Sequence, residues 1–307
     1  MKPGDNPNWF ANSPLDRVNH ESDQSAFIEE QLNSPECVFA PLWRGDPLVT
    51  NGAATFLSGA ARGEFPKSAQ TVYLGAHKGA AHFAVDLSST GETPEAALFA
   101  DLGEYTPIRM STGAISRGDL AIIGHARWLF EWHRKHPFCA VCGGTTTVKN
   151  GGAKRQCEQC EAEHFPRSDP VAIVLALHED ACLLGRGPHF PPGFLSALAG
   201  FVEAAETPEE AAKRELFEEA GITLNDVRYQ FSQPWPFPSS MMMGFIADAE
   251  DRELTLDTNE IEEARWVELP DIKDLLNGEE RHGIYLPPKF TIARQLIERW
   301  VDVTNVT

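Results

Sequence analysis

The stretch GFVEAAETPEEAAKRELFEEAGI, residues 200–222, contains a helix whose two ends are marked in the sequence. Thr207 suits the N-cap, Pro208 suits the first helical position, and Glu210 completes a capping box with Thr207. Gly221 stands where a glycine commonly ends a helix in the left-handed conformation. The pattern therefore predicts a capped helix that begins at Pro208 and ends just before Gly221.

Three acidic side chains share one face of this predicted helix. Glu215, Glu218 and Glu219 stand at i, i+3 and i+4, which places them within about 100° of arc. Three like charges repel one another, whereas Mg²⁺ or Mn²⁺ takes such oxygen ligands and offsets the crowding. The alternative is a solvated acidic face, which is common for a single Glu-Glu pair. Arg214 is in range of Glu206, and their ion pair would hold the preceding loop against the helix.

The complete string resembles the Nudix box, in which a glycine, five residues, a glutamate and seven residues precede R-E-U-x-E-E-x-G-U, U being aliphatic. The fixed positions are filled by Gly200, Glu206, Arg214, Glu215, Leu216, Glu218, Glu219, Gly221 and Ile222. The resemblance implies a Nudix hydrolase, which cleaves a nucleoside diphosphate linked to another moiety by means of Mg²⁺ or Mn²⁺. It makes Glu215, Glu218 and Glu219 metal-binding catalytic residues and adds the backbone carbonyl of Ala199 as a ligand. It also implies that Glu219 removes a proton from the attacking water.

A proline-rich segment, SQPWPFPSS at residues 232–240, follows the box. Its prolines exclude a central strand and predict a stiff, extended segment from which Trp235 and Phe237 project to the same side. The two rings would stack against a flat heteroaromatic group, or alternatively fill the core.

The same segment resembles the signature of the NADH pyrophosphatase subfamily of Nudix enzymes. The resemblance implies hydrolysis of NADH or NAD⁺ to nicotinamide mononucleotide and AMP, with RNA carrying a 5′ NAD cap as a further candidate substrate. The implied substrate-binding residues are Gln233, Pro234, Trp235, Pro236, Phe237, Pro238, Ser239 and Ser240.

Four further positions are assigned by this resemblance. Glu260 in DTNEIEEARW is the expected additional metal ligand, with Glu262, Glu263 or a solvated acidic turn as alternatives. Ala293 in PPKFTIARQLIE is expected to touch the substrate, and simple helix packing is the alternative. Phe165 occupies the position of a substrate-contacting tyrosine of the subfamily and keeps the ring without the hydroxyl. Arg109 in TPIRMST resembles a substrate-contacting arginine, and a surface arginine is the alternative.

The cysteines predict a zinc site. Cys139-x-x-Cys142 and Cys157-x-x-Cys160 are separated by 14 residues, a spacing typical of a zinc ribbon with four thiolate ligands. Such a site has no open coordination position, so the Zn²⁺ would be structural. The subfamily commonly carries this ribbon just before its Nudix domain.

We expect an α+β protein with three domains. A smaller N-terminal α+β domain would occupy residues 1–135, a zinc ribbon residues 136–167, and a Nudix fold, with a mixed sheet between helices, residues 168–307. Helical periodicity predicts a helix over residues 117–135, and β-type runs predict two strands in the first domain, at 71–75 and 82–86. In the last domain the predicted strands fall at 171–177, 181–185, 195–200, 227–232, 241–247 and 264–268, and a helix follows at about 290–303.

Composition excludes several classes of protein. The 307 residues carry a formal net charge of −19, which disfavours a non-specific nucleic-acid binder because phosphate contacts need clustered Lys and Arg. No apolar run approaches the length of a membrane span, and the first twenty residues predict no signal peptide. Paired C-x-x-C motifs favour a reducing, cytoplasmic compartment. The family resemblance also implies a homodimer.

Two alternative functions stay open at this point. One is a broader Nudix pyrophosphatase for ADP-ribose or related dinucleotides. The other is a non-catalytic zinc-ribbon protein that binds RNA or regulates a partner. The intact box counts against the second, and so does the ribbon segment, whose basic and acidic residues balance.

Overall fold

The computed structural model describes residues 6–17 and 25–304, which form two compact units. The N-terminal unit holds Phe10–Ser168 together with Trp235–Ser239. The C-terminal unit holds Asp169–Pro234, the described residues from Ser240 onward and those up to Trp9. Among the described residues, no helix combines the length and hydropathy that a membrane crossing requires.

The C-terminal unit is built on a six-stranded mixed sheet. Its strands are β11 (Asp169–His178), β12 (Ala181–Arg186), β13 (Leu198–Phe201), β14 (Leu224–Trp235), β15 (Ser240–Ala249) and β16 (Glu263–Glu268). The order is β14-β15-β11-β12-β16, with β13 paired to β11. β11 runs parallel to β15 and antiparallel to β12 and β13. The strand order places β14 and β16 at the two ends of the sheet.

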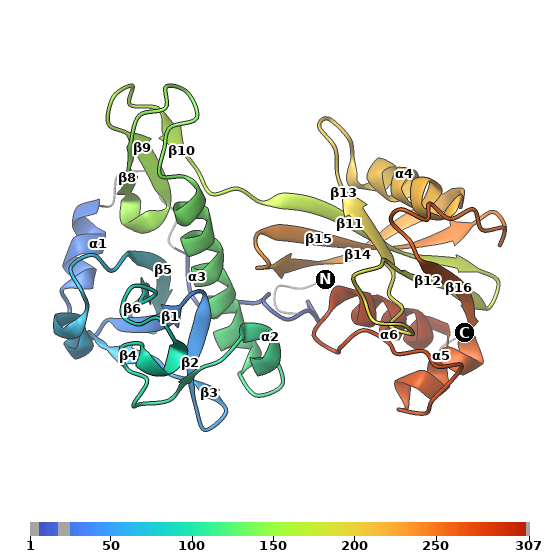
Figure 1. The fold of residues 1–307 in the computed structure, drawn as a ribbon, viewed down its shortest axis with the longest axis horizontal. Coiled ribbons are helices and arrows are strands. Elements are labelled where there is room, and N and C mark those ends of the chain that lie inside the picture. The colour runs from blue at the N-terminus through green and yellow to red at the C-terminus, as the bar shows by residue number, and fades with distance from the viewer. Residues whose placement is uncertain (1–5, 18–24, 305–307) are drawn as a thin grey trace. The chain divides into compact units, whose positions relative to one another are not determined.

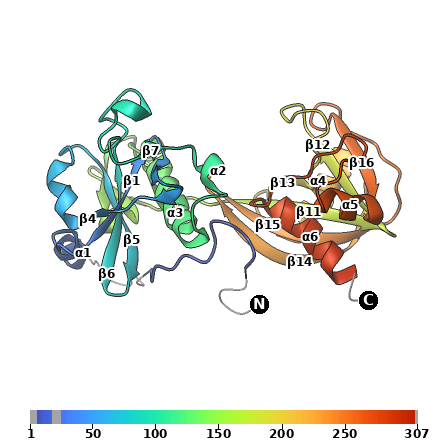
Figure 2. The ribbon, with the colours of Figure 1, turned by 90° about the horizontal axis from the view of Figure 1, so that it is seen from below.

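Helices cover both faces of this sheet, as Figures 1 and 2 show. The helices are α4 (Pro208–Ala220), α5 (Leu269–Leu276) and α6 (Ile292–Thr304). Successive side chains of β11 point to opposite faces, so Leu175 packs in a core with Leu296 of α6, while Val174 packs in a second core with Leu216 of α4. The predicted Nudix arrangement of a mixed sheet between helices is confirmed.

The predicted caps of α4 are also confirmed. The Thr207 hydroxyl accepts a hydrogen bond from the Glu210 amide, and the Glu210 carboxylate accepts one from the Thr207 amide. Gly221 ends the helix at φ 74°, a conformation that favours glycine. A cap of this kind contributes about 1 kcal/mol, so the ends of α4 are fixed locally.

The N-terminal unit contains a seven-stranded sheet. Its strands are β1 (Val38–Trp43), β2 (Asp46–Thr50), β3 (Ala53–Ala54), β4 (Leu57–Ser58), β5 (Thr71–His77), β6 (Ala80–Asp86) and β7 (Glu104–Tyr105). Its helices are α1 (Ser25–Leu32), α2 (Ile108–Ser111) and α3 (Arg117–Lys135), and α3 runs along the sheet (Figure 1). The predicted helix over residues 117–135 is confirmed to the residue, and the two predicted strands lie in β5 and β6.

A small antiparallel sheet follows α3 in the same unit. Its order is β10-β9-β8, and its strands are β8 (Thr146–Lys149), β9 (Lys154–Cys157) and β10 (Glu163–His164). Cys139 and Cys142 lie before β8, Cys157 ends β9, and Cys160 lies in the turn between β9 and β10. Three helices were not predicted, α1, α2 and α5. For α5, the proline at its first turn and the apolar residues at helical spacing were an available signal.

Candidate metal, zinc and dinucleotide sites

Arg214 organises the acidic face of α4. Its Nε and Nη2 each lie 2.8 Å from a carboxylate oxygen of Glu206, so the predicted ion pair is present and bidentate. Its Nη2 also donates to the carbonyl of Phe201 over 2.9 Å. The loop between β13 and α4 is therefore tied to the helix. The Nη1 atom of Arg214 lies 2.8 Å from Glu215 and 3.0 Å from Glu218, which keeps these two carboxylates together.

Glu219 is the buried member of the cluster. Its side chain points inward at 8% exposure, and its Oε2 atom has no hydrogen-bond partner among the described residues. Burial, followed by the charges of Glu215, Glu260 and Glu218, raises the pKa of Glu219 to about 8. A buried carboxylate without a partner, surrounded by other carboxylates, is an oxygen donor set of the kind that Mg²⁺ and Mn²⁺ prefer. The chemistry of these side chains suits a divalent cation, although the carboxylates do not form a close group of ligand atoms such as that of the four cysteines.

The segment before β16 brings a fourth acid to the cluster. The amides of Thr255 and Asp257 donate to the carbonyls of Ala220 and Glu219, over 2.9 and 3.1 Å, and so fasten this segment to the end of α4. Glu260 follows on this segment, and its charge contributes to the raised pKa of Glu219. The alternatives Glu262 and Glu263 both pair with Arg186. Their engagement leaves Glu260 as the better candidate ligand.

The glycine of the motif has a steric reason. A Cβ atom at Gly200 would lie 1.8 Å from Cδ of Glu215, so the carboxylate rests directly on the glycine backbone. Ala199, the expected carbonyl ligand, adjoins Gly200 on β13 and is paired with Ile173 of β11. The strand and the helix thus meet where the motif predicts the metal site.

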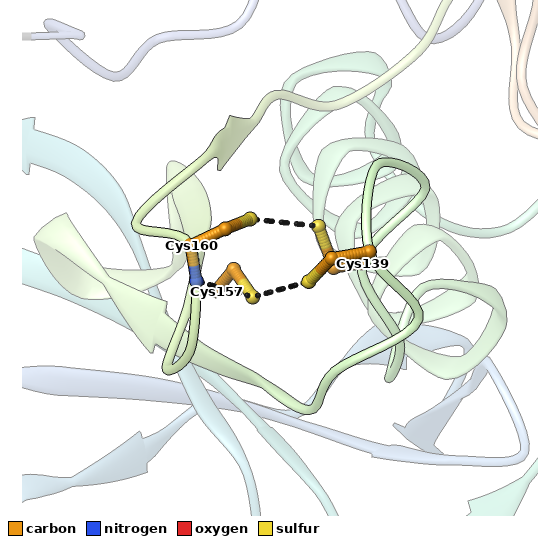
Figure 3. A group of neighbouring side chains, drawn as sticks. Cys139, Cys157 and Cys160 are labelled. Atoms are coloured by element: carbon orange, nitrogen blue, oxygen red, sulfur yellow. Dashed lines mark hydrogen bonds between the residues drawn. The ribbon is translucent and has the colours of Figure 1, made fainter.

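Among the described residues, the four cysteines are the group of potential metal ligands that lies close together, with all four Sγ atoms within 4.8 Å of one another. The Sγ atoms of Cys139 and Cys160 are 3.7 Å apart, and those of Cys142 and Cys157 are 3.4 Å apart (Figure 3). Tetrahedral Zn²⁺ with bonds of about 2.3 Å separates its sulfurs by about 3.8 Å, so the set fits zinc. Hydrogen bonds from the amides of Cys160 and then Gln159 lower the pKa of Cys157 to about 6, which favours the thiolate.

A histidine next to this cluster was missed from the sequence. The Nε2 atom of His164 lies 3.2 Å from Sγ of Cys139. Its position four residues after Cys160, in CEAEH, was the available signal. Histidines and amides around a metal ligand fix its orientation, so His164 belongs to the ribbon's metal environment.

The proline-rich segment differs from its prediction. It is extended only as far as Trp235, because β14 is an edge strand and tolerates Pro234. Residues 236–239 then form a turn that contains a cis peptide between Phe237 and Pro238. The expectation of an extended segment throughout residues 232–240 is therefore wrong. The chain must reverse here because β15 begins at once, with buried Ser240 paired to Asp169 of β11.

The turn nevertheless brings the two aromatic rings together. The ring centroids of Trp235 and Phe237 are 4.9 Å apart, with an interplanar angle of 65°. The guanidinium carbon of Arg109 lies 4.2 Å from the centroid of Phe237 and 5.5 Å from that of Trp235. The N-terminal arginine and the aromatic pair, far apart in the sequence, thus form one cluster within the N-terminal unit.

Other predicted substrate residues lie elsewhere. Gln233 is fully buried in the C-terminal unit, where its amide nitrogen donates to the carbonyls of Trp9 and Phe290, over 3.1 and 2.8 Å, and its oxygen accepts from the amide of Ile292. Ala293, on α6, is 3% exposed in the core, as the packing alternative expects. Phe165 is exposed after β10 in the N-terminal unit. Gln233 and Ala293 thus belong to the C-terminal unit, whereas Phe165 and the aromatic pair belong to the N-terminal unit.

Comparison with known proteins gives three consecutive matches to family models. Residues 36–132 match an NADH pyrophosphatase-like rudimentary NUDIX domain, residues 134–165 the NADH pyrophosphatase zinc ribbon domain, and residues 166–287 the NUDIX domain. The first of these domains was not recognised from the sequence, where the N-terminal segment yielded only a smaller α+β domain.

Curated relatives agree with these matches. The NAD-capped RNA hydrolase NUDT12 of Homo sapiens is 40% identical over 195 residues, which cover 60% of this chain and 42% of that protein. The NAD-capped RNA hydrolase NudC of Chromobacterium violaceum is 36% identical, with 75% of this chain and 80% of that protein covered. The mitochondrial NAD(P)H pyrophosphatase NUDT13 of Mus musculus is 33% identical, with 73% and 69% covered. This chain thus spans about two fifths of the length of the human relative and most of the bacterial one.

The capped helix on a mixed sheet, with its acidic face, defines a Nudix protein. The chain belongs to the Nudix hydrolase family, in the NADH pyrophosphatase subfamily that carries a zinc ribbon.

Proposed function

We propose that this protein hydrolyses the pyrophosphate bond of NADH or NAD⁺ to nicotinamide mononucleotide, reduced or oxidised, and AMP, with Mg²⁺ or Mn²⁺. The observation that carries the proposal is the buried Oε2 of Glu219, which has no described hydrogen-bond partner and faces the charges of Glu215, Glu218 and Glu260. Ionising a buried carboxylate beside other carboxylates is costly, and a bound cation would offset that cost.

The proposed roles follow from the positions of the residues. Glu215, Glu218, Glu260 and the carbonyl of Ala199 would hold the cations, which supply charge neutralisation at the pyrophosphate oxygens. Glu219 would accept the proton of the attacking water, and bound cations would favour the ionised carboxylate that a general base requires. Arg214 would orient Glu215 and Glu218 through the contacts of its Nη1 atom.

Substrate recognition would rest on the cluster of Trp235, Phe237 and Arg109. Aromatic faces stack on a nicotinamide or adenine ring at low entropic cost, and an arginine over a ring can also meet a phosphate. We keep Gln233, Ala293 and Phe165 as candidate substrate residues on the family resemblance alone. RNA with a 5′ NAD cap is the proposed second substrate, supported by the names of the relatives NUDT12 and NudC.

Further proposals concern the whole chain. We propose a structural Zn²⁺ on the four cysteines, the division into domains at 1–135, 136–167 and 168–307, a homodimer, and a cytoplasmic location. The zinc proposal is supported by the closed set of four sulfurs. The homodimer rests on the family resemblance, and the location on the reducing compartment that C-x-x-C pairs favour.

The test is a kinetic comparison of NADH, NAD⁺, ADP-ribose and an NAD-capped RNA, each with added Mn²⁺. We expect NADH or NAD⁺ to be cleaved at a higher kcat/KM than ADP-ribose, and Glu219→Gln to abolish turnover without loss of fold. A higher kcat/KM for ADP-ribose would favour the broader pyrophosphatase. No turnover of any substrate by the zinc-loaded protein would leave the non-catalytic alternative.

A further inference from the structure

The N-terminal unit contains a cavity of about 840 Å³ beside the aromatic cluster. Phe237 and Pro238 form part of its lining, and the rest comes from β2, β6, α2, α3 and nearby turns. Its volume is in the range of sites that hold a nucleotide-sized ligand. Four arginines line it, Arg44, Arg109, Arg127 and Arg134, in a chain whose net charge is −19.

Two of these arginines are neutralised by the acids of the same lining. Arg127 lies 3.4 Å from Asp46, and Arg134 makes two 2.8 Å hydrogen bonds to Glu131. The remaining acid of the lining, Asp86, accepts hydrogen bonds from the amide and the hydroxyl of Ser88. The acidic side chains of the cavity are therefore all occupied within the unit.

Arg44 and Arg109 differ from this pair, because neither forms an ion pair with any described carboxylate. Each lies instead over an aromatic ring, Arg44 at 4.4 Å from the centroid of Trp43 and Arg109 at 4.2 Å from that of Phe237. A guanidinium held over the face of a ring by cation–π attraction still has N–H groups that can meet a phosphate.

Arg127 holds the two sides of the cavity in place. Its Nη1 donates to the carbonyl of Gly45 over 2.9 Å, and its Nε donates to the carbonyl of Pro236 over 2.9 Å. Gly45 follows Arg44 in the turn between β1 and β2, and Pro236 precedes Phe237. A Cβ atom at Gly45 would lie 2.6 Å from Nη1 of Arg127, and φ is +83° there, so this close approach needs glycine. The Arg127 side chain thus hydrogen-bonds both to the turn that carries Arg44 and to the residue before Phe237, the ring beneath Arg109.

We propose that this cavity binds the phosphodiester groups of the RNA nucleotides that follow an NAD cap, with Arg44 as the specificity-determining residue for RNA over the free dinucleotide. The inference rests on the proposed function and deepens it. Cationic groups interleaved with aromatic rings are the usual means of binding single-stranded nucleic acid. A strongly acidic chain repels RNA in general, so locally unpaired arginines are required to hold it.

The experiment compares NADH with an NAD-capped RNA of about eight nucleotides, a length within the usual site size for single strands. Arg44→Gln should leave kcat/KM for NADH unchanged and lower kcat/KM for the capped RNA by about tenfold, mainly through KM, as expected for one charge-assisted phosphate contact. The slope of log(kcat/KM) for the RNA against log[salt] should fall by about 0.7. Arg44→Lys, which keeps the charge without the planar fork, should restore part of the loss.

Arg134→Gln is the matched control, because it removes the same charge from the same cavity at a residue already paired with Glu131. It should leave kcat/KM unchanged for both substrates. An equal loss of kcat/KM for the capped RNA in Arg134→Gln and Arg44→Gln would overturn the assignment to Arg44. An uncapped RNA of the same length should inhibit cleavage of the capped RNA, less so in Arg44→Gln. If the uncapped RNA inhibits the wild type and Arg44→Gln equally, the inference is wrong.

Failure of the inference can be told apart from failure of the proposed function. One outcome is that the wild-type protein cleaves both substrates while Arg44→Gln changes kcat/KM for neither, or for both equally. In that case the cavity does not bind the RNA that follows the cap. If the wild-type protein cleaves neither substrate with Mn²⁺, the proposed hydrolase activity itself has failed.

Discussion

The carboxylate of Glu215 rests on the backbone of Gly200, with no room between them for a side chain. The contact joins the last strand residues before the loop to the middle of α4. It explains why the motif contains a glycine at this position, although its φ does not demand one. The same contact gives the first prediction.

Gly200→Ala should move the Glu215 carboxylate and leave the fold intact, because the atoms that must shift are the flexible end of one side chain. A displaced ligand of about 1 Å can cost about 100-fold in rate, so we expect a loss of that order in kcat for NADH. The free energy of unfolding should change by less than about 1 kcal/mol. Gly63→Ala is the control, since nothing lies within 4 Å of a Cβ there. Unchanged kcat in Gly200→Ala would contradict the role of Glu215.

The pKa of Glu219 predicts a pH dependence of stability without added Mg²⁺ or Mn²⁺. Burial raises this pKa from 4.5 to about 8, so the folded protein binds a proton that the unfolded chain has released. The contribution is fully present below pH 4.5 and is lost as the pH rises through 8. Thermal unfolding of the zinc-loaded protein should therefore show a midpoint that falls over this window, and the fall should be smaller in Glu219→Gln. Parallel pH profiles for the two proteins would rule out a raised pKa.

The ring of Trp235 should matter for binding rather than for folding. It is partly exposed and contacts Phe237 and Arg109. Stacking on an aromatic side chain contributes about 1–3 kcal/mol per base, so Trp235→Ala should raise KM for NADH about tenfold or more. Phe27→Ala removes another exposed ring of the N-terminal unit and should leave KM unchanged. A KM that stays constant in Trp235→Ala would mean that this ring only packs.

His164 should affect how firmly the ribbon holds zinc. The contact of its Nε2 with Sγ of Cys139 is of the kind whose loss weakens metal affinity by about 10–100-fold. In His164→Ala, zinc should transfer to a chelating dye at a lower dye concentration than in the wild type. NADH turnover of the zinc-loaded variant should be unchanged, because the four-sulfur site is closed to substrate. Identical zinc transfer in both proteins would show that the histidine is incidental.

Sequence alone predicted the features that depend on near neighbours. The ends of α4 are fixed by residues within three or four positions of each other, and α3 follows from apolar periodicity. The Arg214–Glu206 pair spans eight residues and was also predictable, because a helix and a short loop leave few alternatives.

Contacts between distant segments were not predictable in this way. No sequence signal near Arg109 indicates that its guanidinium will lie over Phe237. Likewise, no signal near Gln233 indicates that its side-chain amide will hydrogen-bond to Trp9, Phe290 and Ile292. The turn after Trp235 depends on where β15 joins the sheet. Each of these depends on the tertiary pairing of strands, which local patterns do not encode.

The five residues Trp235–Ser239 belong to the N-terminal unit, although the chain on both sides of them belongs to the other. A fragment that begins after residue 168 would keep these five residues. It would lose Phe10, Arg109 and Arg127, which contact Phe237. The two halves are therefore not interchangeable modules. Transplanting the catalytic half alone into another protein would carry the signature motif without the neighbours that shape it.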